Sequence, residues 1–189
     1  MRRAEHGQAT QLTLGIGLKL EPAGRVEGNP VRLQENAGIA FQGAIARGMG
    51  FVLGPEEAAT WLTADPRNSE VLFPYLNGED LNSRPDASAA RWVIDFGDRS
   101  EAEAATYRLP FERVERTVRP EREANEDRAV REHPWWRFWR TVPALRKAIA
   151  ELPEVLAIAL VSKTVMPMRV PRNQVFSHKL AIFATESFA

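Results

Sequence analysis

The chain has 189 residues, of which 44% are hydrophobic and 26% charged, as is typical of one globular domain. It has no cysteine, which excludes disulfides, cysteine–zinc sites and thiol nucleophiles, and its three histidines are too far apart in sequence for metal-ligand spacing. No apolar stretch approaches the roughly 18 residues of a membrane span, and no apolar signal core follows the first residues, so we expect a cytoplasmic protein.

The formal net charge is zero, whereas free-standing nucleic-acid-binding proteins are usually basic. The charge is unevenly distributed along the chain. Residues 134–189 carry eight Lys and Arg against three Glu, a net charge of +5, and the preceding residues carry −5. This asymmetry indicates either a face that meets an anionic partner or an ordinary solvated surface, and composition alone leaves both open.

The first predicted elements are short and separated by glycines. Residues 12–14 and 18–20 predict strands with a bend at 15–17, and a turn-rich stretch follows. Residues 39–43 and 50–53 predict two further β segments. The sequence determines little for residues 1–30, and we place the domain at residues 31–189.

The middle of the chain alternates helices and strands. A helix is predicted over residues 55–62, with Pro55 in its first turn, and Asp65-Pro66 ends it. Residues 71–73 predict a strand, and Asn77-Gly78 predicts a tight turn after it. Residues 91–96 predict a second strand, and Ser100 is the expected N-cap of the next helix.

The last third predicts helices followed by strands. A charged helix is expected over residues 111–131, kinked or split at Pro120, with a short helix at 143–151. Residues 155–161 predict a buried strand. Residues 166–170 and 175–184 predict two strands joined into a hairpin by a turn at 171–174. This mixture predicts an α+β domain.

No catalytic motif is evident. The glycine-rich turn that binds S-adenosylmethionine and the Pro-Pro turn of amino-methylating enzymes are absent. Pro85-Asp86 begins a metal-dependent nuclease pattern, but Asp95, Asp98 and Glu101 lack a lysine two residues later. Adjacent Ser177 and His178 would point to opposite faces of a strand. We therefore predict no catalytic residue and no metal site, and keep the acidic residues as the enzyme alternative.

Two groups of residues suit nucleic-acid binding. The stretch at 135–140 combines tryptophans with Arg137 and Arg140, which could stack on bases and hold phosphates. We favour the alternative for its tryptophans, in which they cap the core. The second group surrounds the expected hairpin and consists of Lys163, Arg169, Arg172, Asn173 and Gln174. These residue types can read base edges in the major groove. The alternative is that they form an ordinary exposed turn.

Several sequence strings occur in the order known from one protein family. They are Phe41-Gln42-Gly43, Gly48-Met49-Gly50-Phe51, Leu72 to Pro85, Arg91 to Phe96, Val118 to Arg122, Trp135-Trp136, Val161-Ser162-Lys163 and Val175-Phe176-Ser177-His178. The series resembles the target-recognition region of large single-chain adenine methyltransferases of type IIG/IIL (MmeI-like) restriction–modification systems. The resemblance runs from Arg32 to the C-terminus and is most specific at residues 74–85.

The resemblance implies a DNA specificity domain of bacterial defence. Its fold would be a single target-recognition domain with a mixed, mostly antiparallel sheet, as a partly open barrel, and several short helices. In such enzymes a methyltransferase domain that uses S-adenosylmethionine precedes this region, sometimes after a magnesium-dependent nuclease domain. The region binds double-stranded DNA and positions the adenine for flipping. We expect the chain to carry no cofactor and to be truncated at its C-terminus.

The resemblance also assigns residues. It places base recognition at residues 162–172, which we carry onto Lys163 and Arg169. The motif residues Tyr75, Asn77, Gly78, Asp80 and Asn82 are expected to be structural, and Arg84 is a candidate for DNA binding. For Asn77, Asn82 and Arg84 two roles stay open: bracing of the loop, which we favour, or contact with DNA or the methyltransferase domain. The alternatives are a non-catalytic fragment that docks on a separate methyltransferase subunit, and a non-functional gene remnant.

Overall fold

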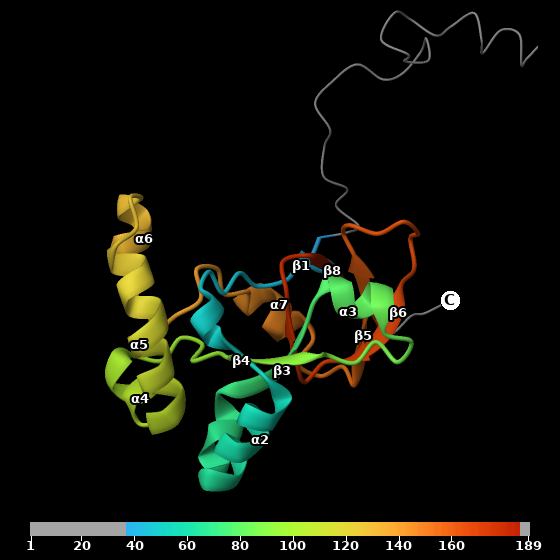
Figure 1. Ribbon diagram of the computed structural model, residues 1–189. Helices are drawn as coiled ribbons and strands as arrows, with labels where there is room; N and C mark the ends of the chain where they lie inside the picture. The colour runs from blue at the N-terminus through green and yellow to red at the C-terminus, as the bar shows by residue number, and fades with distance from the viewer. Residues whose placement is uncertain (1–36, 186–189) are drawn as a thin grey trace, which may run out of the picture. The chain divides into compact units, whose positions relative to one another are not determined.

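The computed structural model describes residues 37–185 (Figure 1). The strands expected at 12–14 and 18–20, and the domain boundary expected near residue 30, lie outside these residues. In chain order the described elements are β1 (Ala40–Gln42), the 3-10 helix η2 (Met49–Phe51), β2 (Val52–Leu53), α2 (Pro55–Ala64), the 3-10 helix η3 (Pro66–Glu70), β3 (Leu72–Leu76), α3 (Gly78–Ser83), β4 (Arg91–Ile94), α4 (Glu101–Ala105), α5 (Arg108–Glu123), α6 (Arg128–Glu132), α7 (Pro143–Ala148), β5 (Glu154–Ala159), β6 (Met168–Pro171), β7 (Val175–Phe176) and β8 (Leu180–Phe183).

The strands form two open sheets of four strands each. Sheet 1 has the order β1-β8-β5-β6 and is antiparallel throughout. Sheet 2 has the order β2-β4-β3-β7, and its last pair, β3 with β7, is parallel. The predicted α+β class and the mostly antiparallel pairing are confirmed, and the described strands are divided between two sheets, neither of which closes on itself.

The prediction of a hairpin around residues 171–174 is wrong. β6 pairs with β5, so that Val155 faces Val170 across the ladder, and both side chains enter the core. After residue 174 the chain passes to sheet 2, where Ser177 N donates to Leu76 O at 2.9 Å. A short polar connection between two apolar strands therefore does not imply that the strands pair.

Each sheet has its own hydrophobic core. The sheet-2 core includes Phe51, Val93 and Phe96, with Val114 and Val118 from α5 packed against them. Phe138 meets Phe51 edge-on at 5.3 Å between ring centroids. The half-buried tryptophans Trp135 and Trp136 pack on the outside of this core, as favoured from the sequence.

The sheet-1 core lies between sheet 1 and helices α3 and α7. Val155, Leu180 and Ile182 supply the strand side, and Leu145 of α7 and Leu81 of α3 supply the helix side. Side chains alternate between the two faces of β5, and Val155 lies on the buried face. The prediction that residues 160 and 161 are buried is wrong. They lie beyond the strand and are exposed.

Asn77 begins a helix rather than a tight turn. Its Oδ1 accepts hydrogen bonds from Glu79 N at 2.7 Å and Asp80 N at 3.3 Å, and Asp80 Oδ2 accepts from Asn77 N at 3.1 Å. This reciprocal capping box satisfies backbone donors at the first turn of α3. The expected turn is therefore corrected to a helix start, because the acid at the third helical position favours the cap.

The predicted charged helix is divided, but not at Pro120. Pro120 lies inside α5, and the break falls at residues 124–127, where Asp127 caps α6 by accepting from Ala129 N at 2.9 Å. Pro120 is exposed and stands in the last helical turn. The carbonyl four residues earlier lacks its usual N–H donor, but water can donate to it at this exposed position, so the helix continues.

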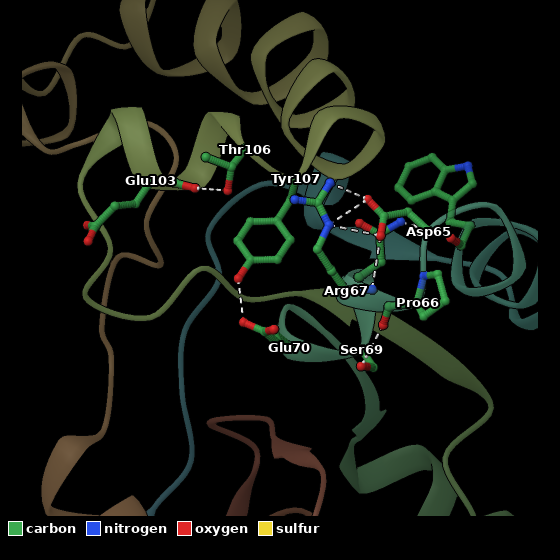
Figure 2. A network of polar contacts seen from close by, with 10 residues as sticks. Asp65, Pro66, Arg67, Ser69, Glu70, Glu103, Thr106 and Tyr107 are labelled. Carbon is green, nitrogen blue, oxygen red and sulfur yellow. Dashed lines mark hydrogen bonds and ion pairs between the residues drawn. The ribbon is translucent and has the colours of Figure 1, made fainter.

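A polar network joins η3 to the helices that follow β4. Figure 2 shows Tyr107 donating its hydroxyl to Glu70 Oε2 at 2.6 Å, while Asp65 accepts from the Arg67 backbone and guanidinium. The hydrogen bond to Glu70, together with burial, raises the pKa of the Tyr107 hydroxyl. The hydrogen bonds from Arg67 lower the pKa of Asp65. The network fixes the chain on both sides of β3 and β4.

Within residues 37–185 no helix has the length and apolar character needed to cross a bilayer.

Candidate nucleic-acid interface

The hairpin formed by β5 and β6 projects an exposed loop at residues 160–167 (orange in Figure 1). The loop holds Lys163 between apolar side chains. Val161 and Val165 are 83% and 86% exposed, and Leu160 and Met166 are also largely exposed. Four exposed apolar side chains within seven residues form a surface of the kind that marks a binding site. We call residues 160–167 the hairpin loop.

The hairpin loop is anchored at its first residues by α3 and by Lys179, the residue before β8. Asn82 Nδ2 donates to Val161 O at 3.0 Å, and Leu160 N donates to Lys179 O at 2.9 Å. Within the loop, Thr164 N donates to Ser162 Oγ at 3.3 Å. The motif residue Asn82 thus contacts the hairpin loop, and the role expected of it stays a prediction.

Arg169 stands on the outer face of the hairpin. Along β6 the side chains of Met168 and Val170 pack toward the sheet-1 core, while Arg169 is exposed, opposite Leu156 of β5. Lys163 and Arg169 therefore belong to one hairpin, and their expected role in base recognition stays a prediction. Lys163 lies in the hairpin loop and Arg169 on the strand that leads away from it.

Arg172, Asn173 and Gln174 lie at the opposite end of β6. Arg172 donates from its guanidinium to Ala150 O, and Gln174 Nε2 donates to Pro171 O at 2.7 Å. The three residues line a cavity of about 330 Å³ beside α7. The structure therefore does not place them at the same end of the hairpin as Lys163.

Arg137 and Arg140 are engaged with backbone carbonyls. Arg137 donates to Arg99 O from Nε at 3.0 Å, and Arg140 donates to Gly43 O at 3.1 Å and to Gln42 Oε1 at 2.9 Å. These bonds attach the tryptophan stretch to the sheet-2 side and to β1. The phosphate contacts expected of these two arginines stay predictions, and the structure supplies a structural role for both.

The remaining motif residues surround α3. Arg84 ends the helix and donates from Nε to Ser88 Oγ at 2.9 Å. Asp80 is buried and accepts from the Asn77 and Ala90 backbones. Gly78 fits closely beside Ala159 and Lys179. Tyr75 of β3 lies beside Asn77 in the wall of a second cavity.

The candidate acidic residues do not form one cluster. Asp86 is exposed and accepts from Ser88, and the hydrogen bonds from Ser88 lower its pKa. Asp95 is buried and pairs with Arg146 of α7, while its Oδ1 accepts from Gly97 N at 2.9 Å. Among residues 37–185, no three histidine, aspartate or glutamate side chains are grouped as metal ligands would be.

Sequence reasoning missed Arg122, which is only 2% exposed. Its guanidinium donates to Ala46 O at 2.9 Å, Arg47 O at 3.2 Å and Pro134 O at 3.0 Å. Burial lowers the pKa of Arg122 to about 10. The available signal was the spacing of Val114, Val118 and Arg122, which places the arginine on the buried face of α5.

Neither a protein-family model nor a curated protein matches the sequence. Among solved structures, the chain is similar to part of the Type IIL restriction-modification enzyme MmeI in complex with DNA. The TM-score is 0.64 at 15% identity, over 89% of this chain and 22% of that chain. The likeness shows a shared fold, and the chain spans about a fifth of the length of that enzyme.

Proposed function

We propose that this chain is the DNA-recognition part of an adenine-N6 methylating restriction–modification system, and that it reads duplex DNA with the β5–β6 hairpin. The observation that carries the proposal is the fold likeness to a segment of MmeI, a restriction-modification enzyme solved in complex with DNA. The exposed hairpin with Lys163 and Arg169 supports it from this chain's own residues.

Each part of the hairpin has a chemical role in this proposal. A two-stranded ribbon fits the major groove, and lysine and arginine donate to guanine O6 and N7 there. Lys163 and Arg169 supply these donors. Val161 and Val165, which are almost fully exposed, suit contact with thymine methyl groups. Arg172, Asn173, Gln174 and Arg84 would extend the contact to flanking positions.

We further propose that this chain does not catalyse methyl transfer. A separate domain or subunit would bind S-adenosylmethionine and accept the flipped adenine, and magnesium would serve only an associated nuclease. The contribution of this chain would be to hold the duplex in a fixed register. Each correct bidentate base contact contributes about 1–3 kcal/mol of discrimination.

A second candidate function is docking on a methyltransferase subunit through the hairpin loop. The exposed apolar side chains of Leu160, Val161, Val165 and Met166 favour it, because protein interfaces bury such residues. This function predicts binding to the subunit that is insensitive to salt and no affinity for duplex DNA alone.

The test is selection from a pool of random duplexes at low and moderate salt, followed by sequencing of the retained DNA. DNA recognition predicts enrichment of a short motif that persists at moderate salt. Retention without a motif would indicate only a basic surface, and no retention by the folded chain would contradict autonomous DNA recognition.

A further inference from the structure

A second cavity, of about 410 Å³, brings together residues from most of the sequence strings noted above. Ala46 to Met49 form one wall, Tyr75 and Asn77 another, and Ser177 to Lys179 a third, with Arg91, Glu79 and Glu121 completing it. We call it the Asn77 cavity. It is separate from the hairpin loop, and the mechanism proposed above makes no use of it.

Asn77 lines this cavity and has an unused hydrogen-bond donor. The residue is 6% exposed, and its Nδ2 has no partner within residues 37–185. Its orientation is fixed, because Oδ1 accepts from the Glu79 and Asp80 backbones and the amide nitrogen must therefore occupy the other position. His178, in another wall of the cavity, has at Nδ1 a second buried atom without a partner among the described residues. Buried polar atoms of this kind are rare unless a ligand or water completes them.

The charges around the cavity favour an anion. Arg47, Arg91 and Lys179 contribute three positive charges. The two carboxylates stand in solvent: the Glu79 side chain is 82% exposed, 3.9 Å from Arg91, and Glu121 is exposed on α5. Three positive charges against two negative ones leave an excess of one positive charge, and water screens the exposed groups of both signs. The cavity therefore combines a buried neutral donor with an excess of positive charge.

The wall that carries Arg47 is held in a fixed conformation. Arg47 has a φ of 50°, a conformation uncommon outside glycine, and its guanidinium lies over the Trp139 ring at 4.6 Å. The carbonyls of Ala46 and Arg47 both accept from the buried Arg122. This fixed wall lowers the entropy lost when a ligand is bound.

We propose that the Asn77 cavity binds one backbone phosphate of the DNA duplex, with Asn77 Nδ2 donating to a phosphate oxygen and Arg47, Arg91 and Lys179 supplying the charge. This inference rests on the proposed DNA recognition. The phosphate contact extends the proposed function, because it would fix the register of the duplex without reading its sequence. Helix α3 joins the two sites, since Asn77 precedes it and Asn82 near its end holds Val161. Five residues separate Asn77 from Asn82, a rise of about 8 Å along the helix axis.

The first test is Asn77→Asp, which keeps the capping oxygen and replaces the donor by a charged oxygen. Aspartate caps helices as well as asparagine does, so the fold is expected to persist. We expect about tenfold weaker binding to the selected duplex, a salt slope shallower by about one, and an unchanged DNA motif. Arg116→Ala removes an exposed charge from α5 outside the cavity and is the matched control, with binding unchanged.

The second test replaces each phosphate of the selected duplex by an uncharged methylphosphonate, one at a time. We expect one position at which the replacement weakens wild-type binding about tenfold and leaves Asn77→Asp binding unchanged. Lys179 is exposed, so Lys179→Ala serves as the second variant if Asn77→Asp does not fold. Its binding, too, is expected to be unchanged by the replacement at that one phosphate. Equal effects on wild type and variants at every phosphate would overturn the phosphate site while motif enrichment still supported DNA recognition. Absence of DNA binding by wild type would contradict both.

Discussion

Arg122 illustrates how one buried cation organises several loops. It contacts the Phe51 ring from 5.5 Å and donates to three carbonyls that belong to two separate segments of the chain. Within residues 37–185 it forms no salt bridge, so its burial is sustained by hydrogen bonds. Two of these carbonyls also accept from the backbone, Ala46 O from Trp139 N at 3.4 Å and Pro134 O from Arg137 N at 3.1 Å.

We predict that Arg122→Met lowers the free energy of unfolding by about 3 kcal/mol. The substitution keeps the length of the side chain but removes three hydrogen bonds from a charged donor, at about 1.5–3 kcal/mol each, partly offset because a buried charge is removed. Chemical denaturation measures the change. Arg119→Met on the exposed face of α5 is the control, with an expected loss below about 1 kcal/mol. Equal losses for both variants would contradict this role.

His133 is expected to make stability depend on pH. Burial lowers the pKa of His133, and the neighbouring Arg122 lowers it further, while the carbonyl of Pro134 opposes the shift. Because the folded pKa lies below the unfolded value, the unfolded chain binds the proton more readily. The stabilisation is therefore complete above about pH 6.5 and is lost as the pH falls below that value.

The measurement is thermal unfolding of wild type and His133→Asn between pH 7 and pH 5. Asparagine keeps a hydrogen-bond acceptor near the Arg122 guanidinium but does not titrate. We expect the melting temperature of the variant to fall less over this interval. Parallel curves for the two proteins would show that His133 does not carry the effect.

At the scale of elements, α3 connects the hairpin loop to the rest of the chain. Its N-terminus is fixed by the capping box of Asn77 and Asp80, and its last turn offers Asn82 to Val161 O. A Cβ added to Gly78 at its start would meet Ala159 of β5 at 3.6 Å, an ordinary contact distance. The specific motif at residues 74–85 therefore acts as a support for the loop that follows β5.

We predict that Asn82→Ala increases the mobility of the hairpin loop with little effect on global stability. The lost hydrogen bond is exposed and contributes about 1 kcal/mol or less. Hydrogen exchange should become faster at residues 160–167 and stay unchanged in β3. Ser83→Ala removes a hydroxyl that bonds only within α3, to Glu79 O, and should leave the loop unaffected. Unchanged exchange in Asn82→Ala would contradict the anchoring role.

Most of the elements, but not all their pairings, could be predicted from the sequence. Local signals such as Pro55, the Ser100 cap and the apolar run at residues 91–94 mark helices and strands correctly. Strand partners depend on distant residues, and β7 pairs with β3 about a hundred residues earlier. The DNA-binding candidates at residues 172–174 therefore follow β6 as expected, but not at the tip of a hairpin.

The candidate site was harder to predict than the fold. Lys163 and Arg169 could be assigned to one region from the sequence resemblance. The Asn77 cavity could not, because Arg47, Asn77 and His178 are brought together only by the crossing of chain segments between the two sheets. Likewise, the unused donor of the buried Asn77 amide can be recognised only once the hydrogen bonds of that side chain are known.

At the scale of the whole described unit, Gly43 joins the two sheets. Its N–H donates to Leu180 O at 3.2 Å, and Ala44 N donates to Phe176 O at 2.7 Å. A Cβ at residue 43 would lie 2.3 Å from the carbonyl oxygens of Phe176 and Ser177. The segments that link the sheets thus contact each other through their backbones.

We predict that Gly43→Ala destabilises the protein by about 3 kcal/mol, because two backbone segments must separate to admit the methyl group. Gly78→Ala is the matched control. Its Cβ would meet nothing closer than 3.6 Å, and alanine favours the helix, so stability should change by less than about 1 kcal/mol. Denaturant unfolding distinguishes the two. Tolerance of Gly43→Ala would contradict the close crossing.

The central claim is that the β5–β6 hairpin reads DNA sequence. The most direct measurement is the ratio of affinities for the selected duplex and a scrambled duplex, determined for wild type, Lys163→Ala, Arg169→Ala and the control Arg116→Ala. We predict that each hairpin substitution lowers this ratio about tenfold, equivalent to the loss of one base contact, while the control keeps it. An unchanged ratio in both hairpin variants would contradict the assignment of sequence reading to this hairpin.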